Sequence, residues 1–526
     1  MGIWDHAVMG FMSVFSGPEA FTLLGISVSV TLVMILIGFL MGITVGATPG
    51  LAGPMAMAIA LPILISIFGF SQDAFLPVMG FLIGIMKGAT LGGSVPAILF
   101  NTPGTPDAYM TTLDGYPMAQ KGQAKKALKV AHLSSVSGDT FSDVVLVLCA
   151  PFLAVLVESY LDLPEKAALL ILSLAFIAAV IGGSVGKGLI SMGLGLLAAM
   201  IATGEDFYPR LTMGSPALAE GFPIATAILG VLILGEVFKS IEDMIRSGIQ
   251  SAPRPAATVA GDRLSFAEIR RLAPHIGRSS VIGTIIGALP GIGSTLAATL
   301  GYTFARARYD NKRSASDPRF GEGAPEGIAA TEAANSAVSG ANLIPVLSLG
   351  IPGNAAAVFL ILGMESIGGF NPGPAVFRVP SDGFNPELIM AFGLFTAMFL
   401  TNGLNWTIGG VFMRAVGVMA RVPKEVLLPV VLLLTLTAIY VQENTMAAMW
   451  IAVGFGMLGY IMRRVGMSPL PFVIAFILGG KLEETARQAF AATGGDPFFL
   501  FTHPIAAAFM VMSLAVIVFN LRKPSP

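Results

Sequence analysis

Two stretches in opposite halves of the chain interrupt an apolar segment with the same proline and glycine pair. The first covers residues 42–58 and contains Pro49-Gly50, and the second covers residues 283–299 and contains Pro290-Gly291. Proline lacks an N–H and blocks the preceding helical turn, while glycine lets the backbone come close to another group. A helix that restarts after the break points its N–H groups and positive dipole end inward. Such a break can hold a carboxylate or a cation without a buried charged side chain.

A second pair of breaks follows the first. Pro96 and Pro103-Gly104 have the same spacing as Pro345 and Pro352-Gly353, with the two prolines seven residues apart. Helices broken at corresponding places in two halves of a membrane protein are typical of a transport site that lies where the repeats meet. We therefore expect the four breaks to form one site.

Short neutral polar side chains surround the four breaks: Ser94, Asn101, Thr102, Ser294, Thr295, Asn335, Asn342, Ser348 and Asn354. Their hydroxyl and amide oxygens, together with the carbonyls freed at the breaks, suit a hard cation of the sodium kind. The alternative is that they cap helices or bond between helices, where small residues pack routinely in membranes. For any one of these residues, both interpretations stay open.

Three charged residues lie near the breaks. We expect Lys87, at the end of an apolar run, to extend its ammonium group to the interface rather than pair with an anionic substrate. Glu332 and Asp114 are either cation ligands and proton carriers or caps of helices and turns. Glu332 is the stronger candidate because Asn335 is close to it in an alanine-rich segment. The four histidines are scattered, so we expect no metal centre.

The composition indicates an integral membrane protein. Apolar residues make up 55% of the chain and charged residues only 12%. Apolar stretches long enough to span a bilayer as helices recur along its length, so the predicted fold is an all-α polytopic membrane protein. The net charge of −1 argues against a nucleic-acid partner, and the single Cys149 can form no intramolecular disulfide. Residues 1–86 contain no Lys or Arg, so we expect the first hydrophobic helix to insert uncleaved.

Loop charge predicts the orientation of the segments. Basic stretches at residues 118–130, 239–278 and 306–319 mark cytoplasmic loops, whereas 69–74, 204–222 and 363–386 are predicted to be external. The expected spans are 139–159, 166–183, 188–204, 223–240, 387–410, 426–441, 446–462, 466–480 and 503–521.

The same charge pattern gives the two halves opposite orientations, which predicts two inverted-topology repeats. The predicted division is membrane repeat 1 at residues 1–240, a basic cytoplasmic linker at 241–278 and membrane repeat 2 at 279–526.

Residues 279–302 predict a re-entrant hairpin. They lie between Arg278 and Arg306, both predicted to be cytoplasmic, with Pro290-Gly291 in the middle. Each arm then has about 11 residues, or roughly 16 Å at helical rise, which is too short to cross the bilayer. The freed backbone groups must face protein or a watery cavity.

Five motifs together resemble a known family: Gly-Ala-Thr-Pro-Gly-Leu-Ala-Gly (46–53), Gly-Gly-Ser-Val-Pro-Ala-Ile-Leu-Phe-Asn-Thr-Pro-Gly-Thr-Pro (92–106), Leu-Asp-Gly-Tyr-Pro-Met-Ala-Gln-Lys-Gly (113–122), Gly-Ile-Ala-Ala-Thr-Glu-Ala-Ala-Asn (327–335) and Leu-Gly-Ile-Pro-Gly-Asn (349–354). They are similar to the large membrane subunit of the tripartite tricarboxylate transporters, the TctA family. The resemblance covers nearly the whole chain. Ser336 stands where the family often has a second Asn, and Pro96 where many members have Thr.

The resemblance implies secondary active uptake of organic carboxylates across the bacterial inner membrane, driven by an ion gradient, usually sodium. It also implies two partners, a small four-helix membrane subunit and a periplasmic binding protein that delivers the substrate. The departures at Ser336 and Pro96 mean that citrate is not assumed to be the substrate. An elevator-like movement of the hairpin-bearing parts is compatible with hairpins of this kind.

Carried onto this sequence, the resemblance implies a site built from both repeats. Repeat 1 would contribute Thr48, Pro49, Gly50, Ser94, Asn101, Thr102, Pro103 and Gly104. Repeat 2 would contribute Pro290, Gly291, Gly293, Ser294, Glu332, Asn335, Ser348, Gly350, Pro352, Gly353 and Asn354. Backbone N–H groups at the breaks would bind substrate carboxylates. A sodium ion would bind among Asn101, Thr102, Ser348 and Asn354, and no other cofactor is expected.

Three other classes of function compete with this interpretation. A self-sufficient carrier of organic anions would have the same repeats but no binding protein. A channel would not need matched breaks with coupling-ion chemistry. An enzyme is disfavoured because the chain lacks the His-Glu-x-x-His motif and the Gly-x-Gly-Asp motif of intramembrane aspartyl proteases. It also lacks a Walker-type loop, so ATP does not power it directly.

Overall fold

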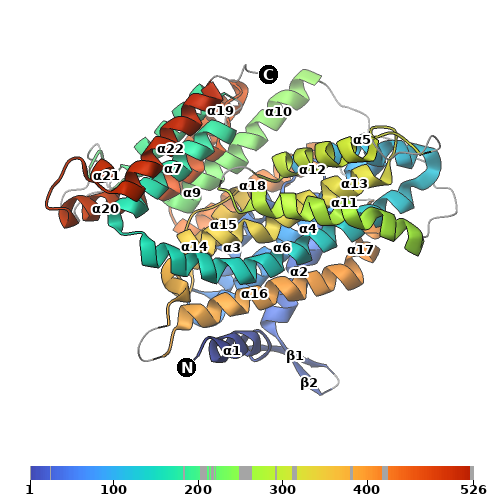
Figure 1. Ribbon diagram of the computed structural model, residues 1–526, viewed down its shortest axis with the longest axis horizontal. Helices are drawn as coiled ribbons and strands as arrows, with labels where there is room; N and C mark the ends of the chain where they lie inside the picture. Colours follow the sequence, from blue (N-terminus) through green and yellow to red (C-terminus); the bar gives the residue numbers. More distant parts are fainter. Residues whose placement is uncertain are drawn as a thin grey trace. The chain divides into compact units, whose positions relative to one another are not determined.

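The protein is an all-α polytopic membrane protein (Figure 1). The computed structural model describes residues 2–23, 25–181, 184–201, 210–212, 214, 218–219, 221–247, 264–290, 293–310, 317–379, 383–417 and 424–521. Within these residues eight helices are long and apolar enough to cross a membrane, and four shorter helices are also apolar. The sole sheet in the described part is a two-stranded antiparallel hairpin of β1 (Glu19–Leu23) and β2 (Ile26–Ser29), which the sequence did not predict.

The chain forms two compact units, and unit 1 comprises Met1–Ala154, Ser251–Leu289 and Gly293–Leu427. Its first part contains α1 (Ile3–Phe15), the β-hairpin, α2 (Val30–Gly46), α3 (Gly53–Phe68), α4 (Gln72–Phe100), η1 (Pro106–Ala108), α5 (Tyr109–Met118), η2 (Ala119–Gln123) and α6 (Ala124–Tyr160), whose last residues belong to unit 2. Its second part contains α11 (Phe266–Gly287), α12 (Gly293–Asp310), α13 (Pro325–Ala341), α14 (Leu343–Leu349), α15 (Ala355–Ser366), η5 (Pro374–Phe377), α16 (Pro386–Leu404), η6 (Asn405–Gly409) and α17 (Gly410–Ala415).

Unit 2 comprises Val155–Gln250, Pro290–Ile292 and Leu428–Pro526. Its helices are α7 (Leu163–Ile181), α8 (Val185–Ala199), α9 (Ile224–Leu229), η4 (Gly230–Leu234), α10 (Gly235–Ser247), α18 (Lys424–Glu443), whose first residues belong to unit 1, α19 (Met446–Arg464), α20 (Leu470–Ala492), α21 (Phe499–Thr502) and α22 (Pro504–Leu521). Helix α20 packs on α7 and α8, and α19 packs on η4 and α10. The exposed faces of α18 and α22 are apolar, with Leu433, Val511 and Leu514 each more than 60% exposed, as expected of surfaces that meet lipid.

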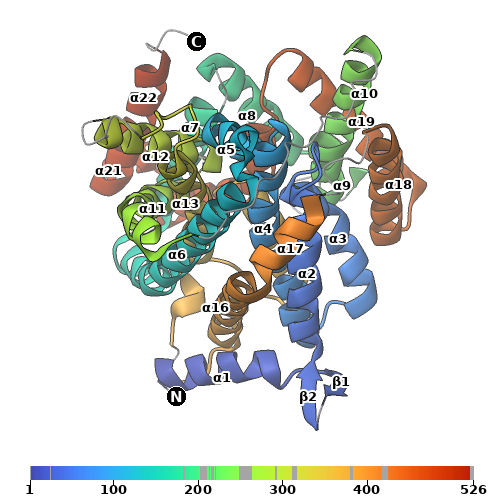
Figure 2. The same cartoon turned by 90° about the vertical axis from the view of Figure 1, so that its right-hand side faces the viewer.

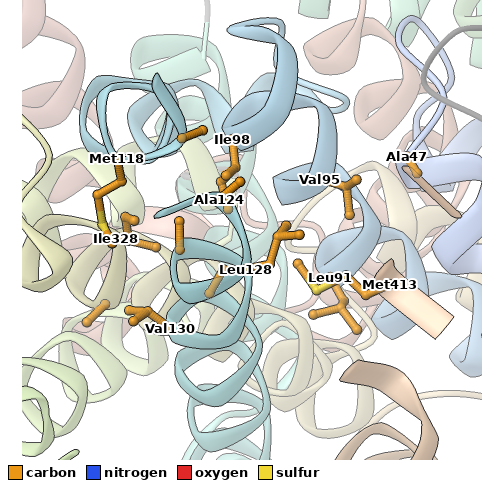
Figure 3. Close-up of a cluster of buried hydrophobic side chains, with 14 of the residues drawn as sticks. Ala47, Leu91, Val95, Ile98, Met118, Ala124, Leu128, Val130, Ile328 and Met413 are labelled. Atoms are coloured by element: carbon orange, nitrogen blue, oxygen red, sulfur yellow. The ribbon is translucent and has the colours of Figure 1, made fainter. Parts of the chain in front are cut away.

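The core of unit 1 combines residues from both halves of the sequence (Figure 3). Leu91, Val95 and Ile98 of α4 lie in one buried cluster with Leu128 of α6 and Ile328 of α13. The compact units therefore do not follow the two sequence halves, because elements of both halves share this core. The predicted repeat boundaries at residues 240 and 279 describe sequence repetition rather than compactness, and they stay a prediction.

Two local expectations need correction. The basic stretch 118–130, predicted as a loop, lies mainly in η2 and α6, which meet at a kink at Gly122, where φ is a non-helical 79°. The arms of the predicted hairpin are also longer than about 11 residues. Helix α11 has 22 residues and α12 has 18, because both continue through their polar ends past Arg278 and Arg306. Entry and exit by one face of the membrane stay a prediction.

Candidate transport site

The first break of each half separates two helices. Helix α2 ends at Gly46 and α3 begins at Gly53, while α11 ends at Gly287 and α12 begins at Gly293. Gly50 takes a positive φ of 92° between α2 and α3, a conformation that costs glycine little. Gly291 lies outside the described residues. The predicted interruptions of both apolar segments are therefore present.

The second break of each half is capped in the same way. Asn101, the C-cap of α4, adopts a left-handed conformation (φ 54°), and the N–H of the next residue donates to Pro96 O at 3.3 Å. Gly350, the C-cap of α14, is also left-handed (φ 68°), and the next N–H donates to Pro345 O at 3.2 Å. A left-handed cap with this backward bond satisfies a carbonyl at the end of the helix. The equal proline spacing noted in the sequence thus corresponds to equal backbone geometry.

The helices that lead into the breaks pack in the same register in both halves. A Cβ on Gly42 of α2 would lie 2.6 Å from Ile85 O of α4, and one on Gly283 of α11 would lie 2.2 Å from Ala334 O of α13. Gly42 precedes Pro49 by as many residues as Gly283 precedes Pro290, and Ile85 and Ala334 stand equally far before Pro96 and Pro345. Small residues let the paired backbones touch. Figure 2 shows α2, α3 and α4 side by side.

The two breaks of each half lie against each other. A Cβ on Gly104 would be 2.1 Å from Gly46 O, so the second break touches the end of the helix before the first. In the other half, a Cβ on Gly353 would be 3.5 Å from Gly287 O and 3.3 Å from the Cβ of Asn342. This contact in the second half is looser than the one in the first half, but it joins equivalent positions of the two halves.

The two halves also meet near the breaks. The Thr295 hydroxyl, at the start of α12, donates to Asp107 Oδ1 of η1 at 2.7 Å. Asp107 closely follows Pro103-Gly104, and α3, which follows Pro49-Gly50, packs on α15, which follows Pro352-Gly353. In both cases the helix after a first break contacts the segment after the second break of the other half. Unit 1 therefore brings together helices that flank the breaks of both halves, whereas Pro290, at the first break of the second half, belongs to unit 2.

Several predicted site side chains make local bonds. Ser94 donates to Leu91 O at 2.7 Å, and Ser348 to Ile344 O at 2.5 Å. Three further local bonds are Thr48 Oγ1 to Thr44 O, Thr102 Oγ1 to Phe100 O, and Ala357 N to Asn354 Oδ1. These bonds correspond to the capping alternative. Each of these side-chain oxygens keeps at least one lone pair that these hydrogen bonds do not use, so the sodium prediction stays untested.

Helix α13 and Asn342, which caps its C-terminal end, carry polar side chains that are buried without partners. Both side-chain polar atoms of Asn335 and of Asn342 lack a hydrogen bond, as does the hydroxyl of Ser336. Unpaired buried polar groups are costly and uncommon in folded proteins. Asn335 is one of the predicted site residues, and its unpaired amide is available for a ligand.

The two acidic candidates differ in their surroundings. Glu332 is fully buried, and its carboxylate accepts hydrogen bonds from Thr111 of α5 and from Ser135 of α6, the latter at 3.0 Å. Asp114 Oδ1 accepts three backbone N–H groups, from Gly321, Gly323 and Ala324 at 2.8–2.9 Å. Asp114 therefore connects α5 to the turn before α13. It has the role of a turn cap, which was the alternative to a cation ligand or proton carrier.

The expectation for Lys87 was wrong. Its side chain is 0% exposed, and its ammonium group lies 2.9 Å from Asp143 Oδ2 and 3.5 Å from Asp139 Oδ1. It stays inside because α6 offers two carboxylates one helical turn apart. Sequence reasoning missed both aspartates because it placed Asp139 at the edge of a span. Their i, i+4 spacing within an otherwise apolar segment was the available signal.

Comparison with known proteins agrees with the motifs. The model of the tripartite tricarboxylate transporter TctA family matches residues 32–474. An uncharacterized 52.8 kDa protein in the TAR-I ttuC' 3' region of Agrobacterium vitis is 32% identical over 440 residues, which is 82% of this chain and 83% of the relative. An uncharacterized protein in the TAR-II ttuC' 3' region of the same organism is 32% identical over 243 residues, 45% of this chain and 93% of the relative.

Among solved structures, crystal structures of manganese transporter mutants from Eremococcus coleocola align with 84% of this chain and 94% of theirs. The identity is 13% and the TM-score 0.14, too low to inform the fold or the function. The family match extends over most of the chain and includes all four breaks. The chain belongs to the TctA family of tripartite tricarboxylate transporters and is therefore a membrane transporter subunit rather than an enzyme.

Proposed function

We propose that this chain is the permease subunit of a binding-protein-dependent transporter that takes up organic carboxylates across the bacterial inner membrane. The proposal rests chiefly on the meeting of broken segments from both halves in unit 1, where Thr295 contacts Asp107. Helices α3, α12 and α15 each begin after a break. Their N-terminal N–H groups and dipoles favour a carboxylate. A substrate with several carboxylates would match several helix starts.

The energy source in this proposal is a cation gradient, with sodium as the first candidate. The chain has no Walker-type loop. Hydroxyl and amide oxygens line the breaks, and such oxygens are the ligands that hard cations prefer. A periplasmic binding protein would deliver the substrate, and a small four-helix membrane subunit would complete the transporter. An elevator-like movement remains a prediction of the family resemblance.

The decisive experiment is uptake of labelled di- and tricarboxylates into proteoliposomes. Uptake is measured with and without an inward sodium gradient, and with the binding protein and small subunit added or withheld. The proposal expects uptake that needs both the gradient and the binding protein. Gradient-driven uptake by this chain alone would favour a self-sufficient carrier. Conductance without coupling would contradict both proposals.

Asn101→Ala and Asn354→Ala test the predicted sodium ligands. Each variant is compared with wild type for the sodium concentration that gives half-maximal uptake. The prediction expects a clear rise of this concentration in at least one variant, because a neutral oxygen ligand is lost. An unchanged sodium dependence in both variants would mean that sodium does not bind at these two breaks.

A further inference from the structure

A buried ion cluster in unit 1 has one more negative charge than positive charge. It consists of Lys87 on α4 with Asp139 and Asp143 on α6, and all three side chains are at most 1% exposed. Ser339 of α13 donates to Asp139 Oδ1, and Asn402 Nδ2 of α16 donates to Asp143 Oδ2 at 2.7 Å. Four helices from both halves of the sequence thus converge on two carboxylates and one ammonium group.

Charge balance is the first argument. Removing an ion from water costs several kcal/mol unless a partner compensates it. Lys87 can neutralise one carboxylate, which leaves the other without a counter-charge. Among the described residues, Lys87 is the sole cation that forms an ion pair with either carboxylate. Glu332, another buried carboxylate, is held separately by Thr111 and Ser135.

Unpaired oxygens are the second argument. Asp143 Oδ1 and Asn402 Oδ1 are buried and have no hydrogen-bond partner, although the other atoms of the same two groups bond each other. Asp143 Oδ1 lies over Gly340 of α13, where a Cβ would be 2.2 Å away. A carboxylate oxygen and an amide oxygen, both unsatisfied and carried by side chains that bond each other through their other atoms, are hard donors suited to a small cation.

We propose that Asp139, Asp143 and Asn402 form a binding site for one monovalent cation, a sodium ion or a proton, next to the fixed ammonium group of Lys87. The cation neutralises the second carboxylate. Lys87 is a fixed positive charge whose repulsion lowers the affinity of the site for the cation. This inference rests on the proposed function, to which it adds a coupling-ion site. It uses residues other than the Asn101, Thr102, Ser348 and Asn354 set.

The site explains how a cation can act on the transport breaks. Ser339, which bonds Asp139, lies on α13, the helix that carries Glu332 and Asn335 and leads to Asn342 beside Gly353. Loss of the cation would leave two carboxylates against one ammonium group. That imbalance favours a different placement of α6 against α13.

The test measures cation binding to purified protein and therefore needs no transport. Sodium-22 binding is measured at pH 8. Proton uptake on acidification is measured separately in choline chloride, with a pH indicator. Sodium binding by wild type, or an uptake of protons that exceeds that of Asp143→Asn, supports the proposal and identifies the cation. Absence of both overturns it.

Substitutions separate a charge site from a structural ion pair. Asp143→Asn makes the cluster neutral and should weaken binding about a hundredfold or more. Lys87→Gln removes the competing charge and should tighten binding at least about tenfold. The double variant restores a single negative charge and should recover binding. Asp73→Asn, at an exposed position in the first turn of α4, is the matched control.

Whether the two substitutions change cation binding in opposite directions or in the same direction distinguishes a cation site from a structural ion pair. A purely structural cluster predicts that Asp143→Asn and Lys87→Gln both weaken or both leave binding unchanged, and either result overturns the proposal. Size-exclusion profiles identify variants that fail to fold, and Asp139→Asn then replaces Asp143→Asn in the comparison. Wild-type uptake that needs sodium, together with Asp143→Asn binding that equals wild type, refutes the site but leaves the proposed function intact. Cation binding without any carboxylate uptake refutes the function instead.

Discussion

Gly104 lies directly over the backbone carbonyl of Gly46, so that a Cβ on Gly104 would be 2.1 Å from Gly46 O. The corresponding Cβ on Gly353 would have its nearest neighbours at 3.3 and 3.5 Å. The two second breaks therefore differ in how much space they leave, although their sequence spacing is the same.

Gly104→Ala is expected to destabilise the protein by about 1–3 kcal/mol, because the added methyl group meets backbone that cannot rotate away. Gly353→Ala is the matched variant, and it should cost less because its neighbours need to shift only slightly. The midpoint of thermal unfolding in detergent checks both. Equal midpoints for the two variants would contradict the contact between the breaks.

The positions of the breaks were predictable because their causes are local. Proline and glycine impose the same backbone consequence wherever they stand, so Pro49-Gly50, Pro103-Gly104 and Pro352-Gly353 all lie between helices. The helix ends near Arg278 and Arg306 were misjudged for a related reason. Charged residues were taken as loop markers, but helices continue through them when no breaker follows.

The partners of the charged groups were not predictable from one sequence. Lys87 and Asp143 lie 56 positions apart in the chain, so only the packing of α4 against α6 shows that they pair. The three backbone donors of Asp114 likewise come from a turn more than 200 residues away. Burial and long-range pairing depend on tertiary structure, whereas break positions depend on the local sequence.

Asp114→Ala should destabilise the protein by about 3 kcal/mol or more. The variant leaves the N–H groups of Gly321, Gly323 and Ala324 without their acceptor in a mostly buried turn. Asp114→Asn keeps an oxygen at the same position and should cost less. Thermal unfolding ranks the three proteins. An Asp114→Asn variant of wild-type stability that lacks all uptake would instead make Asp114 a coupling residue.

Asn354 has a measurable role as the cap of α15. Its Oδ1 accepts the N–H of Ala357 at 2.9 Å, so Asn354→Ala should cost about 1 kcal/mol. Asn354→Asp keeps the acceptor and should retain the stability. If Asn354 acts only as a cap, the alanine variant lowers the unfolding midpoint with no change in sodium dependence. A changed sodium dependence in the aspartate variant, at unchanged stability, would show that this oxygen binds the ion.

Glu268, at the start of α11, gives a pH dependence. The hydrogen bond from Lys126, followed by that from the backbone N–H of Ser265, lowers the pKa of Glu268 to about 2. A carboxylate whose folded pKa lies below its unfolded value of about 4.3 adds stability that is complete above the unfolded pKa. That stability is lost as the pH falls through the folded pKa.

Glu268→Gln should therefore lower the unfolding midpoint at pH 7 by an amount that corresponds to about 0.5 kcal/mol, because the Glu268 side chain is 36% exposed and solvent screens the pair. The difference from wild type should shrink below about pH 4.5 and vanish near pH 2. Repeating the substitution in a Lys126→Met background should reduce the effect at pH 7, since the main cause of the lowered pKa is gone. A difference that stays constant between pH 7 and pH 3 would mean that Glu268 stabilises α11 through its shape rather than its charge.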